Sequence, residues 1–149
     1  MAAVYGVNIT NLDATPRVPA SSEQVHGVLR VWYDTYEASS LSAADTITMA
    51  RMPAYSTVHD VVLKCDALAG SSTLIVGDSD DPNRFIEASG TWNAAGQTQS
   101  MLGGTSAGAP TVSMNGLAHR YTSETDIIIT TGGATINNTL HMWVYYTTD

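Results

Sequence analysis

Apolar and polar residues alternate with a period of two over much of the chain between residues 25 and 147. This period puts successive side chains on opposite faces of a β-strand. It predicts strands over residues 25–37, 45–52, 58–68, 72–78, 98–102, 111–121, 126–131 and 137–147. Short strands at regular spacing, separated by loops rich in glycine, serine and proline, indicate an all-β fold. The expected architecture is an antiparallel β-sandwich or jelly roll, and periodicity alone does not distinguish these two topologies.

One segment departs from the strand pattern and looks like the start of a helix. Asp81 is a favourable N-cap residue, and Pro82 is favourable at the first helical position. Residues 82–88 are therefore expected to form one short helical turn. It is too short to be a structural helix in its own right.

The first and last predicted strands carry bulky side chains on both faces. In the first strand, Val31 and Tyr33 lie on one face and Trp32 on the other, so other parts of the protein or a partner are expected to cover both faces. In the last strand, Trp143 and Tyr145 alternate with the apolar residues that would form the core. The hypothesis is that Trp143 and Tyr145 form a subunit interface, where tryptophan and tyrosine are enriched. The alternative is a sugar-stacking platform formed by the tryptophans, including Trp92 and Trp143, and the tyrosines.

The first 24 residues are expected to form an extended N-terminal arm, and residues 25–149 a single β-sandwich domain. Pro16 and Pro19 exclude a helix across the second half of the arm. One interpretation is a loose terminus or an edge strand. The other is an extended segment that orders against a partner by adding to a sheet edge. On that second interpretation the arm has apolar anchors and one charged residue at the rim, namely Val4, Tyr5, Val7, Ile9, Leu12 and Arg17.

Composition narrows the class of function. The 149 residues carry a net charge of −8, and only 13% of them are charged, which disfavours binding to nucleic acid. The one cysteine, Cys65, excludes an intrachain disulfide, a four-cysteine zinc site and a CxxC redox pair. No run of 18 apolar residues and no secretory signal is visible, so a chain made in the cytosol without a membrane span is expected.

No pattern of catalytic or metal-binding residues stands out. The acidic group of Asp78, Asp80 and Asp81 is the best metal candidate, but Pro82 and the lack of a following glycine break the calcium-loop pattern. A helix cap with carboxylates at its positive end explains these residues better. Cys65 is expected to be a small buried apolar residue rather than a nucleophile. No catalytic residue, cofactor or metal is therefore expected.

The stretch from Asp45 to Phe85 resembles the head decoration, or cement, proteins of tailed bacteriophages. The similar features are an Arg51-Met52-Pro53 turn, a strand that ends in Asp66-Ala67-Leu68, a strand that ends in Gly77-Asp78, and an Asp81-Pro82-Asn83-Arg84-Phe85 turn. The resemblance covers about a quarter to a third of the chain. The positions Arg51, Pro53, Gly77, Arg84 and Phe85 look like turn-shaping and packing residues.

The resemblance implies a jelly-roll-like structural protein on the outer surface of a phage capsid. Such a protein would be a homotrimer that binds the major capsid protein, bridges capsomers and stabilises the shell, with the arm residues as capsid contacts. It would be made in the bacterial cytoplasm and would reside in the virion. The alternative is a carbohydrate-binding or receptor-binding module of a phage fibre or neck, and an enzyme is the least favoured class because no catalytic cluster is present.

Overall fold

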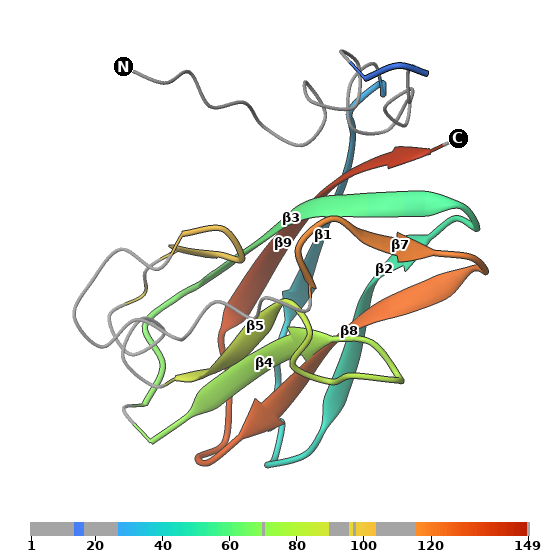
Figure 1. Cartoon of the computed structure of the whole chain (residues 1–149). Coiled ribbons are helices and arrows are strands. Elements are labelled where there is room, and N and C mark those ends of the chain that lie inside the picture. The colour runs from blue at the N-terminus through green and yellow to red at the C-terminus, as the bar shows by residue number, and fades with distance from the viewer. Residues whose placement is uncertain are drawn as a thin grey trace, which may run out of the picture.

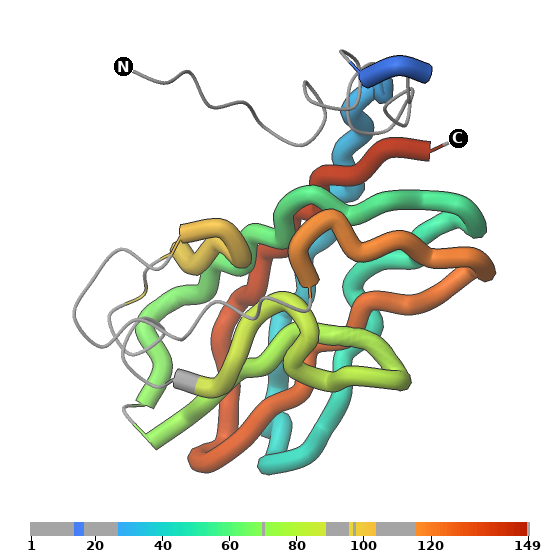
Figure 2. The backbone as a smooth tube through the Cα atoms, viewed as in Figure 1, coloured from blue at the N-terminus to red at the C-terminus, as the bar shows by residue number. Residues whose placement is uncertain are grey.

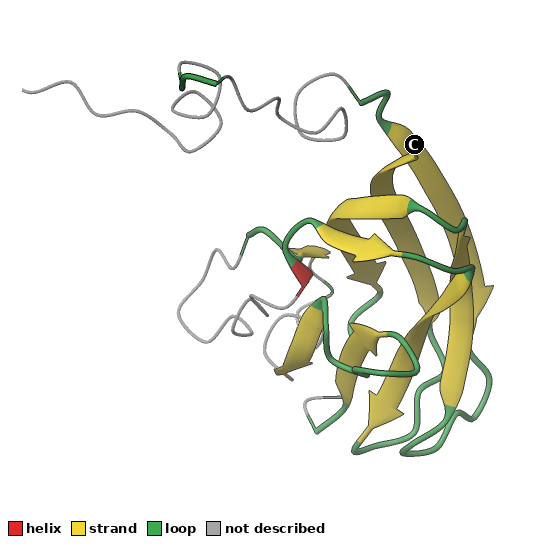
Figure 3. Cartoon of the chain, turned by 45° about the vertical axis from the view of Figure 1, so that its right-hand side comes forward, coloured by secondary structure: helices red, strands yellow, loops and turns green. Residues whose placement is uncertain are grey.

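The computed structural model describes residues 14–16, 27–69, 71–89, 96, 98–103 and 116–148. Most of these residues lie in strands, and among them only a short segment at Gly116 is helical (Figure 3). The strands are β1 (Arg30–Glu37), β2 (Thr46–Met52), β3 (Ser56–Cys65), β4 (Thr73–Gly77), β5 (Ile86–Ser89), β6 (Thr98–Ser100), β7 (His119–Tyr121), β8 (Thr125–Gly132) and β9 (Thr139–Thr148). No helix within the described ranges is long and apolar enough to cross a membrane.

The strands form two antiparallel sheets that pack face to face (Figure 1). One sheet has the order β1-β9-β3-β6, and the short strand β7 also pairs with β3. The other has the order β2-β8-β4-β5. Strands that follow one another in the chain mostly change sheet, as the tube in Figure 2 shows, which is the jelly-roll arrangement. The expected all-β sandwich is confirmed, and the strand order selects the jelly roll.

The core lies between the two sheets and follows the period-two pattern. In β9 the side chains of Leu140, Met142 and Val144 are buried, whereas the intervening side chains are only partly covered. In β8 the buried side chains are Ile127 and Ile129. The alternation predicted for β9 is confirmed, because one face of each sheet meets the other sheet and the other face points outward.

The turn after β8 illustrates how the sequence sets a strand end. β8 ends at Gly132, and Gly133 follows it in the turn. Gly133 has a φ of +72°, a backbone conformation that side chains other than glycine disfavour. A Cβ atom at this position would also overlap the carbonyl oxygen of Ser71. The turn therefore requires glycine for both conformation and space.

The expected helical turn at residues 82–88 is wrong. The amide of Arg84 donates to the carbonyl oxygen of Asp81 at 3.1 Å, which closes one tight turn. The next amide, of Phe85, donates instead to the carbonyl oxygen of Val76 at 2.9 Å, and β5 begins at Ile86. Pairing with β4 therefore replaces helical hydrogen bonding, because it buries Phe85 and Ile86 in the core.

Candidate interaction surface

The strand β1 is an edge of its sheet and is exposed on both faces. All eight of its residues are exposed, although it pairs with β9 along its whole length. The exposed fractions of Val31 and Tyr33 are 53% and 51%, and Val28 and Leu29, just before the strand, are also exposed. The described residues of one copy therefore leave all eight positions of this strand exposed, although a cover was expected on both of its faces. We call residues 28–37 the β1 edge.

An aromatic surface borders the β1 edge on the outer face of the same sheet. The register places Tyr33 opposite Trp143, and Val31 opposite Tyr145. The Tyr33 and Trp143 rings lie 5.0 Å apart between centroids, and the His141 ring stacks at 6.2 Å from Trp143. The Tyr33 hydroxyl and His141 Nδ1 share a hydrogen bond of 3.0 Å. We call Tyr33, His141, Trp143 and Tyr145 the aromatic face.

The inner side of the β1 edge forms a groove against β2. Trp32 donates from its indole Nε1 to the carbonyl oxygen of Met49 at 3.0 Å. The register of β2 against β8 shifts between Thr48 and Ala50, so Met49 lies in a bulge. A groove of about 290 Å³ remains beside this hydrogen bond, lined by Trp32, Asp34, Thr48, Met49, Ala50 and Arg51. Trp32 thus joins the edges of the two sheets by one bond.

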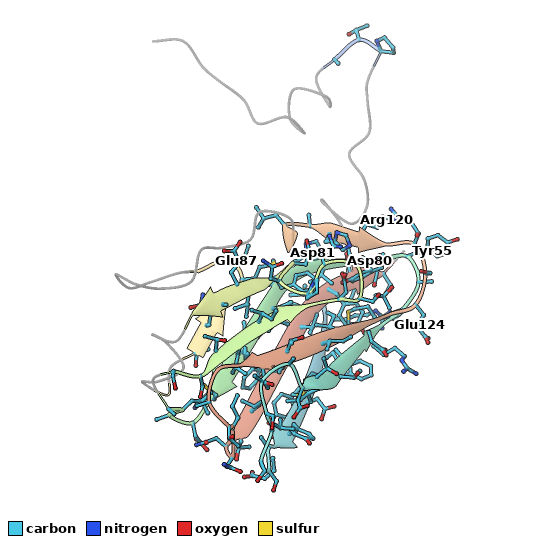
Figure 4. All side chains as sticks on the ribbon, turned by 90° about the horizontal axis from the view of Figure 1, so that it is seen from below. Tyr55, Asp80, Asp81, Glu87, Arg120 and Glu124 are labelled. Atoms are coloured by element: carbon cyan, nitrogen blue, oxygen red, sulfur yellow. The ribbon has the colours of Figure 1, made fainter. Side chains whose placement is uncertain are left out.

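A second, polar hollow lies where loops meet beside the start of β8. Its volume is about 550 Å³, and its charged lining residues are Arg51, Asp80, Glu124 and Asp126. Arg51 Nε donates to Asp126 Oδ1 at 2.7 Å on the exposed surface. Figure 4 shows Tyr55, Asp80 and Glu124 on this side of the sandwich. Arg51 Nε also lies 3.8 Å from Glu124 Oε1, so the hollow is an acidic surface region in which one arginine is paired with two carboxylates.

The structure gives Asp78 a role in the fold, although the acidic group Asp78, Asp80 and Asp81 was considered as a metal site. Asp78 is buried, and its Oδ1 accepts from the amides of Asp80 and Asp81 at 3.0 and 2.9 Å. Its Oδ2 accepts from Arg84 Nε at 2.6 Å and from the Tyr121 hydroxyl at 2.7 Å. The carboxylate therefore binds protein donors on both oxygens. The side chain of Asp78 thus caps this turn by accepting from two of its amides.

The pKa shifts in this network follow from burial and charge. Burial alone would raise the pKa of Asp78, but the hydrogen bonds from Arg84, Tyr121 and the Asp81 amide, together with the Arg84 charge, bring it below its ordinary value. Burial and the hydrogen bond to Asp78 raise the pKa of Tyr121. Burial and the Arg84 charge lower the pKa of the neighbouring His119. Near neutral pH the network is thus a carboxylate, a guanidinium and two neutral rings, which is an arrangement that stabilises the fold.

Cys65 is buried, as expected. Burial, and then the charge of Asp66, raise the pKa of its thiol to about 12, so the reactive thiolate is scarce at neutral pH. Within the described part of the chain, no three histidine, cysteine or acidic side chains form a group suited to a metal ion.

The structure describes only some of the residues predicted for binding. Trp143 and Tyr145 lie on the outer face, as their alternation indicated, and Trp143 contacts Tyr33 and His141. The arm residues Val4, Tyr5, Val7, Ile9, Leu12 and Arg17 lie outside the described residues, as does Trp92.

Sequence reasoning missed Tyr33 and His141 as members of the aromatic face. The signal was present in part, since the alternation placed Tyr33 on one face of the first predicted strand, and His141 has the same parity as Trp143 in the last. Their proximity depends on the pairing of β1 with β9, which joins residues more than 100 positions apart.

The sandwich belongs to a class of fold found in phage capsids. The chain matches a chain of the capsid asymmetric unit of cyanophage Pam1 at 22% identity with a TM-score of 0.67, over 100% of both chains. It matches a chain of the capsid of Ralstonia phage GP4 at 18% identity with a TM-score of 0.60, covering 83% of this chain and 86% of that one. A chain of the acidic stable capsid of Helicobacter pylori bacteriophage KHP30 matches at 14% identity with a TM-score of 0.56, over 83% and 90%. No protein-family model matches the chain, and no curated protein matches its sequence.

Proposed function

We propose that this chain is a structural protein of a phage virion that binds the outer surface of the capsid. It acts as a homotrimer that contacts the major capsid protein, bridges neighbouring capsomers and stabilises the shell. The observation that carries the proposal is the shared jelly roll: the match to a chain of the Pam1 capsid extends over the whole length of both chains. The sequence resemblance over residues 45–85 points to the same class independently of the fold.

The surface of the sandwich supports a role in assembly. A β1 edge with all strand residues exposed, beside an aromatic face, is apolar surface that a partner would cover. We assign Trp143 and Tyr145 to the interface between subunits, and we extend this assignment to Tyr33 and His141, whose rings lie beside Trp143. Aromatic side chains bury a large area at small conformational cost, which suits them to such an interface.

Shell stabilisation would work by mass action. A protein that binds only the assembled shell lowers the free energy of that state and makes its disruption harder. In a trimer the three copies bind together, so weak single contacts add through effective concentration. The arm residues Val4, Tyr5, Val7, Ile9 and Leu12 are the proposed apolar contacts to the shell, with Arg17 at their rim.

Shell binding is tested by sedimentation of the purified full chain with phage heads that lack it. We expect stoichiometric binding to heads and none to tails or fibres. Val7→Asp should weaken binding about tenfold or more, because burying one aliphatic side chain stabilises by about 1.5–3 kcal/mol. Asn8→Asp adds the same charge at the adjacent position and serves as the matched control. If the wild-type protein does not bind heads, the proposal is wrong. If Val7→Asp binds heads as well as the wild type does, the arm has no role in binding.

The trimer is tested separately by light scattering at micromolar concentration. Trp143→Ala should shift the population towards monomer, whereas Ile128→Ala, on the outer face of the other sheet, should leave it trimeric. Circular dichroism would verify that both variants keep the fold. A wild-type monomer would remove the subunit interface from the proposal but leave shell binding standing.

A second function is favoured by one observation on the aromatic face. The His141 ring lies within 24° of the Trp143 plane and within 9° of the Tyr33 plane, and the Tyr33 and Trp143 rings are tilted by 33°, so three aromatic rings cluster on one surface. Such a surface suits stacking against a sugar ring. Glycan-array binding that is lost in Trp143→Ala would favour a receptor-binding module of a fibre or neck.

A further inference from the structure

The four edges of the two sheets are protected to different degrees. Within the described residues, β5 and β6 are edge strands of only four and three residues. The edge strand β2 carries the bulge at Met49, and Trp32 binds the carbonyl oxygen there. The β1 edge has none of these devices: its strand is eight residues long, pairs with β9 without a register shift and contains no proline. A long regular edge of this kind is a template for another strand.

We infer that the β1 edge is completed by residues 5–9 of a second copy of this chain, which add to it as a further strand. The inference rests on the proposed function, since it names the contact that would join the subunits of the trimer. Alternate residues of β1 direct their amide and carbonyl groups away from β9, and an added strand would pair with those groups.

The donor segment has the sequence of a strand. Tyr5, Val7 and Ile9 occupy every second position and alternate with Gly6, Asn8 and Thr10. The segment carries no charge, so it meets no like charge opposite Arg30, Asp34 or Glu37 of β1. It also contains no proline, so every residue has an amide to donate.

The length of chain before the sandwich allows the donor to reach a neighbour. Eighteen positions separate Ile9 from Gly27, and an extended chain of that length spans up to about 60 Å. A ten-residue strand such as β3 is only about 33 Å long. If the donor segment paired with β1 of its own chain, a hairpin loop of two to five residues would be enough to connect them. The long connection with Pro16 and Pro19 fits a crossing to a second copy better.

The symmetry of this exchange agrees with a trimer. The donor segment and the acceptor edge are different surfaces, so the contact is heterologous and closes into a ring when the rotation between copies permits. The acceptor edge also borders the proposed subunit interface, because Val31 and Tyr33 of β1 pair with Tyr145 and Trp143 of β9. A neighbour seated on the aromatic face therefore lies beside the edge that its arm would complete.

Strand addition leaves the arm free for its proposed contact with the shell. Pairing uses the backbone, whereas the side chains of an added strand project from the two faces of the sheet. The apolar set Tyr5, Val7 and Ile9 would lie together on one face. One segment can thus join two copies through its backbone and touch a third partner through its side chains.

The test is cross-linking between differently tagged full-length chains that are expressed together. The donor chain carries Val7→Cys or Asn8→Cys, which cover the two faces of the added strand. The acceptor chain carries Val31→Cys or Thr35→Cys, at opposite ends of β1. Thr98→Cys, exposed on the other edge of the same sheet, is the matched control. The native Cys65 is buried and contributes little background.

We expect disulfide-linked pairs of donor and acceptor at β1 to exceed those at Thr98 about tenfold or more, since opposed Cβ atoms in paired strands lie about 4.5–5.5 Å apart. The acceptor position that reacts gives the register of the added strand. Equal linking to Thr98→Cys, no linking, or linking only within one chain that carries both cysteines would overturn the exchange. Head binding is measured on the samples that carry Asn8→Cys, which keeps all the proposed shell contacts: if binding is lost while the cross-link forms, only the capsid role fails.

Discussion

Replacing Asp78 by asparagine should be among the most damaging conservative changes in this protein. The side chain of Asp78 is 1% exposed and that of its partner Arg84 is 14% exposed. Asparagine keeps the shape, and its Oδ1 can still accept from the amides of Asp80 and Asp81. Its Nδ2, however, would take the place of the oxygen that lies 2.6 Å from Arg84 Nε. Two donors would then face each other, and a nearly buried guanidinium would lose its counter-charge.

The expected cost of Asp78→Asn follows from that geometry. Removing one partner of a buried ion pair typically costs about 3–5 kcal/mol. For a chain of this size, each kcal/mol lowers the melting temperature by about 2–4 °C, so Asp78→Asn should lower it by about 6–20 °C.

Asp126→Asn is a matched control for this substitution. Its Oδ1 lies 2.7 Å from Arg51 Nε, nearly the same distance, but Arg51 is 58% exposed in this pair. Surface pairs contribute about 0–1 kcal/mol, so Asp126→Asn should lower the melting temperature by less than about 4 °C.

The assay is thermal and urea unfolding of both variants at one fixed protein concentration, because self-association would shift the apparent stability. The pH dependence provides a second readout. The pKa of Asp78 is lowered in the folded state, so its contribution is complete above about pH 4, the ordinary pKa of aspartate, and is lost as the pH falls through the folded value. In Asp78→Asn the free energy of unfolding should therefore depend less on pH in the acid range than in the wild type. Equal losses in Asp78→Asn and Asp126→Asn would refute the reasoning that burial makes the difference.

Three further predictions concern other parts of the sandwich. Gly77→Ala should lower stability by several kcal/mol in urea unfolding, because the added Cβ would overlap the backbone of Asp81 and Pro82, and a near-wild-type midpoint would contradict this close approach. Trp32→Phe removes the donor to the Met49 carbonyl and should cost about 1 kcal/mol, with faster amide exchange in β2 as the local measurement. Cys65 should react with a thiol reagent at neutral pH only after denaturation, and rapid labelling of the native protein would count against its burial and raised pKa.

Several features of the fold were predictable because they depend on neighbouring residues. The alternation of Leu140, Met142 and Val144 with partly covered residues set the faces of β9, since a strand has a period of two wherever it lies. The end of β8 is also local, because Gly133 adopts a positive φ that glycine favours. The helical turn at Asp81-Pro82 failed because its local preference was outweighed by pairing of the next residues with β4.

The candidate surface was predictable only in part. Trp143 and Tyr145 were assigned to an exposed face by alternation, and that placement holds. The β1 edge was not recognised, because the same residues in a central strand would be covered on both sides. Whether a strand is central or at an edge depends on which distant segments pair, and the pattern of one strand carries no information on that.

The sequence by itself determined most of the segments that become strands, with β5 as an exception, and the apolar side of the core strands, and it showed no familiar catalytic pattern. These properties follow from side-chain period, turn chemistry and composition, all of which act over a few residues. Tertiary structure alone decided the jelly-roll order, the ring contacts of Tyr33 with Trp143 and the burial of Asp78 against Arg84 and Tyr121. Each of these joins residues that the chain brings together only when the whole core forms, because a sheet gains its stability from pairing and burial across its width.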